Sequence, residues 1–243
     1  MSSLKFTFHY SFFFILFINL INSSAWAEPV IVFSSGKADP FVTTAHDGFY
    51  DLILKEMFQR IGLSAKAELQ PSERSLINAN SGINDGNVAR IIGLEKKYKN
   101  LIRVPEKMVD YEFVAFTKNK NITIKNWDSL EAYNIAYITG WKIFEKNVKH
   151  YKSLVRTQNI EQLFQLLEKN RIDIALYDRW SGAWKVKQLK SDIFHLQPPI
   201  VSKKMYLYVH KKHKALIPSL TKSLQSMKED GTYQQIFKKT LHH

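Results

Sequence analysis

Short apolar runs of strand length alternate with helical patterns along this chain, and this alternation limits the possible folds more than any other feature. Residues 30–33 (Val-Ile-Val-Phe) are continuously apolar, and apolar side chains recur at helical spacing over residues 50–61. A second strand is predicted at residues 64–69, and Ser72 is the expected N-cap of a second helix. The order strand, helix, strand, helix predicts a parallel sheet whose loops form one wall of a crevice.

The same alternation is repeated in the second half of the chain, which predicts two lobes. Strands expected at residues 101–105 and 112–117 lead into a polar stretch, Lys118-Asn119-Lys120-Asn121. The chain returns through a strand at residues 205–209. We therefore predict an α/β protein in which each lobe is a mixed sheet flanked by helices. Lobe 1 is expected to contain residues 28–117 and 203–243, and lobe 2 residues 118–202. Two crossings between the lobes predict a hinge near residues 116–119 and 200–203.

The N-terminal residues have the features of an export signal. Lys5 precedes an apolar run at residues 12–21, and Ala25-Trp26-Ala27 is a small-x-small cleavage pattern. We predict a signal peptide at residues 1–27, cleaved after Ala27, and a periplasmic location. An uncleaved N-terminal anchor is the alternative. No later apolar stretch has spanning length, so stable membrane insertion is not expected.

Charge and cysteine content narrow the function classes. The chain has no cysteine, which excludes disulfides and Cys-based metal sites, and no metal-ligand spacing is present. Loss of the leader removes Lys5 and leaves 34 basic against 22 acidic residues, a net charge of +12. This charge favours anionic partners. The lysines are scattered and no nucleic-acid motif occurs, so we interpret most of the charge as solvated surface and expect no nucleic-acid partner.

Several polar and aromatic residues near predicted strand ends are candidates for ligand contacts. Arg90 follows a glycine-rich turn at residues 82–86, and Arg suits two-point binding of a carboxylate. A salt bridge within the lobe is the alternative role for Arg90. The other candidates each have an ordinary structural alternative as a cap, a turn, a solvated side chain or a core residue, and they are Arg74, Glu73, Ser35, Thr139, Gly140, Trp141 and Tyr111.

The order of these motifs resembles the periplasmic solute-binding proteins of the amino-acid-binding type, family 3 of those that serve ABC transporters. The resemblance covers the whole mature chain. It is carried by Gly48-Phe49-Tyr50-Asp51-Leu52, by Gly82-Ile83-Asn84-Asp85, by the strand ending at Asp178 and by the ending Gly231-Thr232-Tyr233. It implies a two-lobed periplasmic-binding-protein-like fold of type II that closes on a small molecule. By the same resemblance, Asp85 lies at the cleft and Asp178 holds a ligand amine. A cap for the following helix is the alternative for Asp178.

Two departures from the family pattern argue against an α-amino acid as the ligand. The family's Thr-x-x-Arg is absent, and Glu95-Lys96-Lys97 occupies that neighbourhood. The aromatic residue that often stacks on the ligand is replaced by Ala38.

We therefore predict a monomeric protein without a cofactor that binds a small polar or anionic solute, either amino-acid-like or an organic acid. The expected partner is an ABC permease or a membrane sensor. The alternative is an enzyme on the same scaffold, a lyase resembling cyclohexadienyl dehydratase, in which Glu73, Asp85 or Asp178 would be the acid or base.

Overall fold

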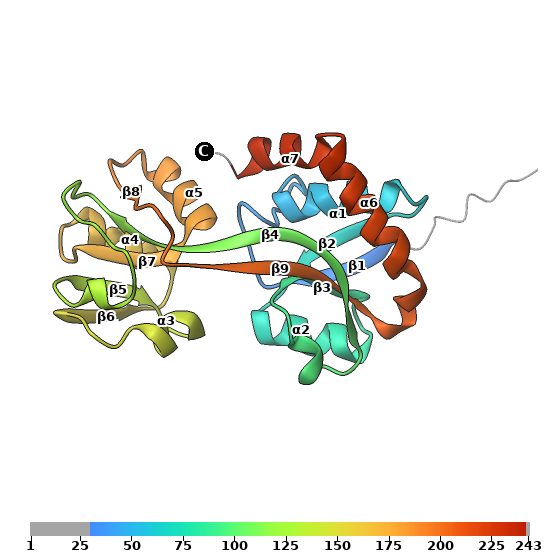
Figure 1. The fold of residues 1–243 in the computed structure, drawn as a ribbon, viewed down its shortest axis with the longest axis horizontal. Coiled ribbons are helices and arrows are strands. Elements are labelled where there is room, and N and C mark those ends of the chain that lie inside the picture. The colour runs from blue at the N-terminus through green and yellow to red at the C-terminus, as the bar shows by residue number, and fades with distance from the viewer. Residues whose placement is uncertain (1–29, 242–243) are drawn as a thin grey trace, which may run out of the picture.

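A computed structural model describes residues 30–241. Two lobes lie side by side and are connected by two long strands, as Figure 1 shows. The predicted signal peptide and its cleavage point lie outside the described residues. Within residues 30–241, no helix has both the length and the apolar character needed to cross a bilayer.

Lobe 1 contains the first three strands and the C-terminal helices. β1 (Ile31–Ser35) lies between β2 (Ala65–Leu69) and β3 (Gly86–Arg90), and both pairings are parallel, as the strand–helix order predicted. The helices of this lobe are α1 (Phe49–Gln59), α2 (Ser72–Ser81), α6 (Ile217–Glu229) and α7 (Thr232–Thr240), with short 3-10 turns at Leu94–Lys96 and Lys211–Leu216.

Lobe 2 repeats this arrangement with the middle of the chain. β5 (Asn134–Ile138) lies between β6 (Ser153–Thr157) and β7 (Ile174–Asp178) in parallel pairings. Its remaining elements are a 3-10 turn at Asp128–Leu130, the helices α3 (Lys142–Asn147), α4 (Ile160–Glu168) and α5 (Arg179–Leu189), and the short strand β8 (Phe194–His195).

Two long strands connect the lobes and join their sheets into one. β4 (Leu101–Thr117) and β9 (Val201–His210) pair in antiparallel fashion, and β4 continues into a pairing with β7. The strand order is β2-β1-β3-β9-β4-β7-β5-β6, with β8 on β4. The prediction of separate strands at residues 101–105 and 112–117 was wrong, because pairing with β9 continues past an irregular stretch between Arg103 and Val109. Pro105 lies in that stretch, where a missing N–H disturbs the ladder least.

The start of α2 also differs from the prediction. Pro71, and not Ser72, is the N-cap residue, and Ser72 is the first helical residue. The Ser72 hydroxyl is instead the acceptor of a hydrogen bond from Arg90 at 3.1 Å. Gly82 ends the helix with a φ of 83°, the left-handed conformation that glycine adopts most easily, and turns the chain toward β3.

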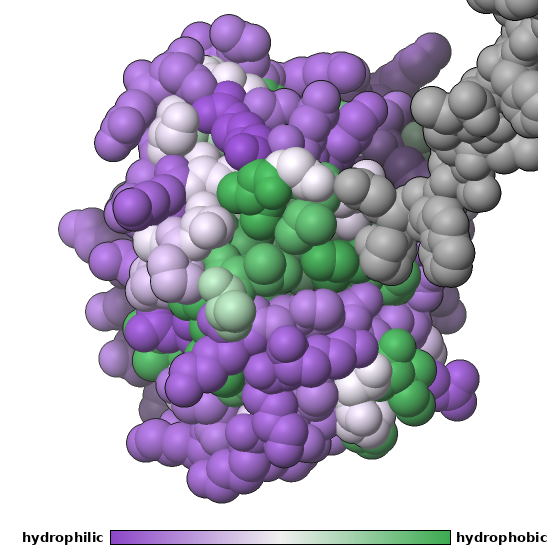
Figure 2. Space-filling view, turned by 90° about the vertical axis from the view of Figure 1, so that its right-hand side faces the viewer, coloured by the Kyte–Doolittle hydropathy of each residue, from purple (hydrophilic) through white to green (hydrophobic). Residues whose placement is uncertain are grey.

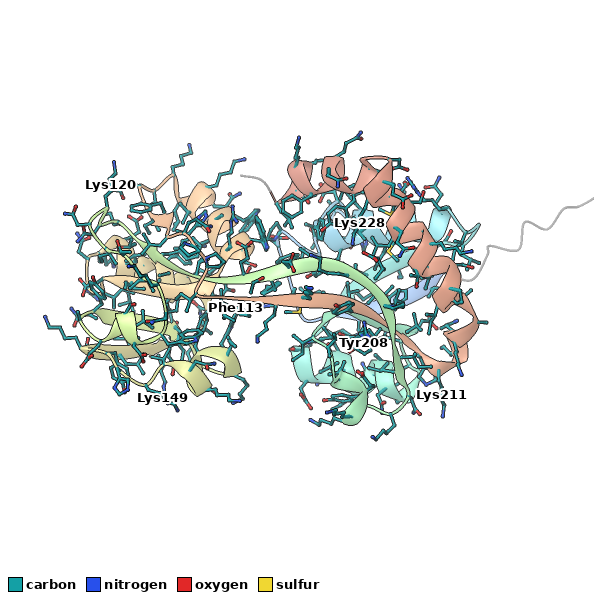
Figure 3. The ribbon with its side chains drawn as sticks, viewed as in Figure 1. Phe113, Lys120, Lys149, Tyr208, Lys211 and Lys228 are labelled. Carbon is teal, nitrogen blue, oxygen red and sulfur yellow. The ribbon has the colours of Figure 1, made fainter. Side chains whose placement is uncertain are left out.

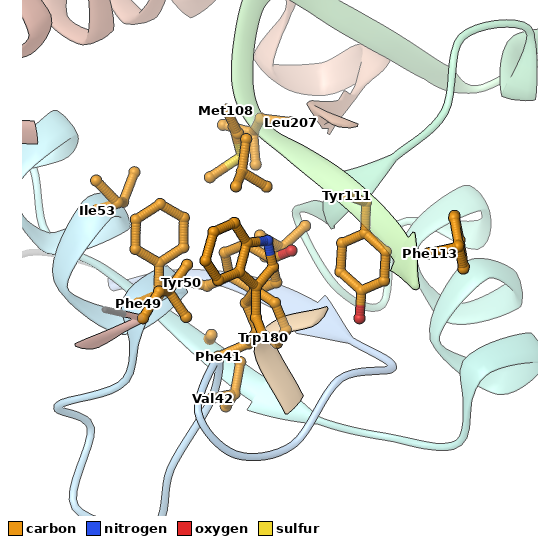
Figure 4. Close-up of a cluster of buried hydrophobic side chains, with 14 of the residues drawn as sticks. Phe41, Val42, Phe49, Tyr50, Ile53, Met108, Tyr111, Phe113, Trp180 and Leu207 are labelled. Carbon is orange, nitrogen blue, oxygen red and sulfur yellow. The ribbon is translucent and has the colours of Figure 1, made fainter. Parts of the chain in front are cut away.

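Aromatic side chains fill the core where the two lobes meet. Trp180, at the start of α5 in lobe 2, packs at 5.0 Å and 84° against Phe237 of α7 in lobe 1. In Figure 4, Trp180 lies among Phe41, Tyr50 and Met108, all of which belong to lobe 1 or to β4. The Trp180 indole N–H also donates to the carbonyl of Asp110 at 3.2 Å. Lobe 2 is therefore anchored on lobe 1 by an apolar contact as well as by the crossing strands.

The outer face of lobe 1 is mainly hydrophilic. Figure 2 shows polar residues above and below a smaller, central apolar area. Labelled lysines at residues 120, 149 and 211 extend from the outside of the ribbon in Figure 3. These observations agree with the interpretation of the basic composition as solvated surface.

Candidate functional site

A cavity of about 890 Å³ lies between the lobes. Lobe 1 contributes Lys37 and Arg90, the crossing strands contribute Tyr111 and Met205, and lobe 2 contributes Trp141 and Tyr177. Phe113, also a lining residue, lies on β4 at the passage between the lobes in Figure 3. The cavity is therefore built from segments that are far apart in the sequence.

Arg90 reaches the cavity because β3 is irregular just before it. Ala89 has a φ of 55°, a left-handed conformation that costs an L-residue roughly 1–2 kcal/mol. The pairing of β3 with β9 shifts its register between Asn87 and Arg90. An irregularity of this kind redirects the side chains that follow it. The guanidinium is then fixed from the helix side by α2, where Nη2 donates to the Ser75 hydroxyl at 2.8 Å.

The positive charge of Arg90 has no carboxylate partner within residues 30–241. Its four hydrogen bonds go to neutral groups, namely the side chains of Asn87, Ser72 and Ser75 and the carbonyl of Ser72. Arginine has five N–H donors, so one N–H of Nη1 stays uncommitted among the described residues. Burial lowers the pKa of the guanidinium, although arginine still remains charged. A half-buried cation held in position by neutral groups is suited to a ligand anion. The predicted salt-bridge alternative is not observed in the described structure.

Lys37 is a second cation in the cavity, and our prediction from the sequence missed it. Its loop is shaped by Ser35, whose hydroxyl accepts the Lys37 backbone N–H at 3.1 Å. The Nζ atom lies 4.0 Å from the ring centre of Trp141 and 4.9 Å from that of Tyr111. Burial lowers the pKa of this ammonium and the nearby Arg90 lowers it further, whereas Asp178 opposes them. Nothing in the local sequence Ser-Gly-Lys-Ala distinguishes Lys37 from the many surface lysines.

Asp178 lies fully buried beside the cavity. Its Oδ1 accepts the Ser181 backbone N–H at 2.9 Å and so caps α5, the alternative role considered for this residue. Its Oδ2 and the hydroxyls of Tyr50 and Tyr111 form no hydrogen bond of normal geometry among the described residues, although the Tyr111 hydroxyl is near enough to the Asp178 carboxyl to lower its pKa. Burial raises the pKa of the Asp178 carboxyl, and Lys37 opposes this rise. Unpartnered buried polar atoms are uncommon in folded proteins, and three of them cluster here.

The aromatic side of the cavity comes mainly from lobe 2. Trp141 packs on Tyr177 with ring centres 4.6 Å apart and stacks on Phe144 at 5.7 Å. Gly140 lines the cavity with a φ of 88°, and its N–H donates to the Glu145 side chain at 2.8 Å. A carboxylate of the protein therefore already occupies the start of α3, where a free anion-binding N–H had been predicted. Thr139 is exposed and does not line the cavity.

Four other predicted residues are not brought to the cavity, and one of them is Ser35, whose hydroxyl bonds to the Lys37 backbone. Arg74 is exposed on α2, and Glu73 accepts hydrogen bonds from Tyr98 at 2.8 Å and Lys97 at 3.2 Å. Asp85 accepts the Val32 backbone N–H at 2.8 Å and pairs with Lys212 and His213, both at 2.7 Å.

Asp85 thus connects β1 to the turn after β9 and lies just before β3, whereas Arg90 lies at the other end of that strand. Of the three acids considered for lyase chemistry, only Asp178 lies next to the cavity. Within residues 30–241, no cluster of three His, Asp or Glu side chains is arranged to hold a metal ion.

Comparison with known proteins supports the fold. No protein-family model matches the chain. An uncharacterised protein of Shewanella oneidensis is 26% identical over 211 residues, which cover 78% of this chain and 75% of the relative.

Solved structures of similar fold have lower sequence identity. The substrate-binding protein of an amino acid ABC transporter is 19% identical with a TM-score of 0.66, covering 88% of this chain and 100% of that one. Substrate-binding domain 2 of Lactococcus lactis GlnP, in an open conformation, is 17% identical with a TM-score of 0.69, covering 89% and 97%. The GluR0 ligand-binding core in complex with L-glutamate is 9% identical with a TM-score of 0.73, covering 88% and 99%.

These structures define the class of the molecule. The chain has the type II periplasmic-binding-protein fold, as predicted, and its neighbours are amino-acid substrate-binding proteins over about 88% of its length. At these sequence identities the structural similarity establishes the fold. The class of ligand depends on the residues that line the cavity.

Proposed function

We propose that this protein is a periplasmic solute-binding protein that takes a small organic anion into the cavity between its lobes. The observation that supports the proposal is Arg90, a half-buried guanidinium at the cavity wall that forms no ion pair within residues 30–241. Hydrogen bonds to charged groups contribute about 1.5–3 kcal/mol each, so a single bond from the uncommitted Nη1 N–H of Arg90 to a carboxylate accounts for part of micromolar affinity.

The charge of the whole cavity favours the same class of ligand. The lining cations outnumber the lining acids and comprise Lys37, Arg90, Lys142, Lys146 and Lys203, against Asp39 and Glu161. Glu161 is already paired with Lys185 at 3.1 Å, outside the set of lining residues. A positive cleft with apolar walls attracts an anion before any specific contact forms.

Closure of the lobes is the proposed means by which binding is communicated. The cavity is lined from both lobes, so a ligand that touches Arg90 on one side and Trp141 on the other favours the closed form. The closed form is then read by an ABC permease or a membrane sensor. The hinge predicted near residues 116–119 and 200–203 stays a proposal, and on the β4 side we propose that bending occurs before Phe113, because Phe113 to Phe116 already pair with β7 of lobe 2. Small-angle scattering with and without ligand tests this step, and an unchanged shape at saturation contradicts it.

The binding test is a thermal-shift screen with amino acids, organic acids and polyamines, followed by calorimetry on the best ligand. We expect an organic acid to give the largest shift. Arg90→Met removes the charge at similar length and should weaken that ligand roughly 10–100-fold. Arg90→Lys retains the charge, which separates loss of the anion contact from loss of the hydrogen bonds to α2.

Arg74→Met is the matched control, because Arg74 is an exposed arginine of the same lobe that does not line the cavity. Its affinity should equal that of the wild type. Undiminished binding by Arg90→Met, or an equal loss in Arg74→Met, refutes the role proposed for Arg90.

A further inference from the structure

The ammonium group of Lys37 occupies a position normally suited to the cationic part of a ligand. It lies between two aromatic faces, one from β4 and one from lobe 2, at 4.9 Å from Tyr111 and 4.0 Å from Trp141. An ammonium within about 6 Å of an aromatic ring centre is stabilised by the ring quadrupole. Lys37 comes from the loop after β1, so this contact also bridges the two lobes.

Buried polar groups complete the surroundings of this ammonium. The Oδ2 atom of Asp178 is buried without a hydrogen-bond partner in the described structure, and Asp178 and Lys37 attract each other electrostatically. The hydroxyls of Tyr50 and Tyr111 are likewise buried and unpartnered. Aromatic faces together with a carboxylate are the groups that recognise an ammonium ion. Here the protein supplies that ammonium itself.

The remaining walls of the cavity are largely apolar. Beyond the cations already described, the lining includes Val88, Phe113, Ile143, Ile160 and Met205. Such walls suit a hydrocarbon body rather than a second polar group. The volume of about 890 Å³ leaves room for such a hydrocarbon body.

From these observations we infer that Lys37 is a built-in substitute for the ligand's amino group, and that the protein selects carboxylates that lack an amine. This inference rests on the proposed function and names its ligand class: monocarboxylic or dicarboxylic acids with an apolar body and no α-amino group. The carboxylate contacts Arg90 and faces the Lys37 ammonium. A ligand ammonium meets a like charge at this place, and the nearby Asp178 carboxyl, which could otherwise balance it, already lies in the field of the Lys37 ammonium.

The test compares acids with the α-amino acids that differ from them by the amino group alone. Suitable pairs are succinate with aspartate, glutarate with glutamate, 4-methylpentanoate with leucine, and 3-phenylpropionate with phenylalanine. Calorimetry of the full mature chain gives the ratio of the two dissociation constants in each pair. We expect the wild type to bind the better acid at least tenfold more tightly than its amino acid partner.

Lys37→Met should cancel this preference or reverse it, because it removes the ammonium and leaves an uncharged side chain of similar length. We expect the ratio to change by at least tenfold in favour of the amino acid. Lys37→Gln is the second variant if the Met variant folds poorly. Lys203→Met is the matched control: Lys203 is an exposed lysine at the same cavity, so its removal should weaken both members of a pair equally and leave the ratio unchanged.

The outcomes separate this inference from the proposed function. If acid binding depends on Arg90 but the ratio of the two dissociation constants is the same in wild type and Lys37→Met, the inference is wrong and the proposed function still holds. A wild type that prefers the amino acids overturns it as well. If no pair shows binding that depends on Arg90, both the proposed function and the inference fall.

Discussion

Replacing Asp85 with Asn should lower the stability of lobe 1 and leave ligand binding intact. Asp85 was predicted to line the cleft, but both of its carboxylate oxygens form hydrogen bonds or ion pairs with other residues of lobe 1. Oδ2 accepts the Val32 N–H at 2.8 Å, and Oδ1 accepts from Lys212 and His213 at 2.7 Å. These contacts tie β1 to the turn that follows β9, across more than a hundred residues of sequence.

The expected size of the effect follows from the contacts that Asn cannot keep. An amide has one acceptor oxygen, so its NH₂ group must face either the Val32 N–H or the side chains of Lys212 and His213. A buried donor left without an acceptor costs about 1–3 kcal/mol. The Lys212 side chain is 44% exposed, so its pair with Asp85 is screened and contributes less than about 1 kcal/mol. We therefore expect a loss of roughly 2–3 kcal/mol in the free energy of unfolding, or a Tm lower by roughly 4–12 °C.

The pH dependence provides an independent check on the same contact. Burial acts to raise the pKa of Asp85, but hydrogen bonds from Lys212, His213 and Val32 outweigh it, so the pKa is lowered on folding. A lowered pKa stabilises the folded state above the unfolded value of about 3.9, and this contribution is lost as the pH falls through the folded value. The stability difference between wild type and Asp85→Asn should therefore be largest near neutral pH and should shrink below about pH 4.

Urea denaturation and calorimetric binding measure the two quantities separately. Glu73→Gln is the control, since its pair with Lys97 is largely exposed and its loss should change stability much less. If Asp85→Asn leaves stability unchanged but abolishes binding of the best anionic ligand, the placement of Asp85 as a structural residue is refuted.

Three further substitutions test the surroundings of the cavity. Gly182→Ala should lower the free energy of unfolding by roughly 1–3 kcal/mol, because its Cβ would overlap the Phe116 ring; denaturation should show the loss, and an unchanged midpoint would contradict it. Ala89→Gly should raise thermal stability by up to about 1 kcal/mol by relieving the φ of 55°, whereas a lower Tm would show that this backbone is unstrained. Tyr50→Phe removes a buried, unpartnered hydroxyl and should leave the ligand-free protein as stable or about 1 kcal/mol more stable, so a marked loss in denaturation would reveal a bond to this hydroxyl.

The sequence by itself determined the elements, their order and the presence of two lobes. Periodicity located α1, α4 and β7 to within a residue or two, because a buried face imposes a repeat of 3.6 or 2 on any chain that forms these elements. The composition change after residue 117 coincides with the end of β4. Arg90, Tyr111, Gly140 and Trp141 could be singled out because they lie near predicted turns and strand ends, and all four line the cavity.

Only the tertiary structure decided which charged side chains face the cavity and which are paired with other residues of the protein. Asp85 lies just before β3 and Arg90 at its end, five residues apart, yet Asp85 pairs with Lys212 and His213 after β9, whereas the irregularity at Ala89 directs Arg90 into the cleft. Lys37 carries no local signal, and its place between Tyr111 and Trp141 exists only because three distant segments meet there. The periodic spacing of apolar residues shows which face of a helix or strand is buried. The partner of a polar side chain depends on contacts between distant segments, and these produce no periodic pattern in the sequence.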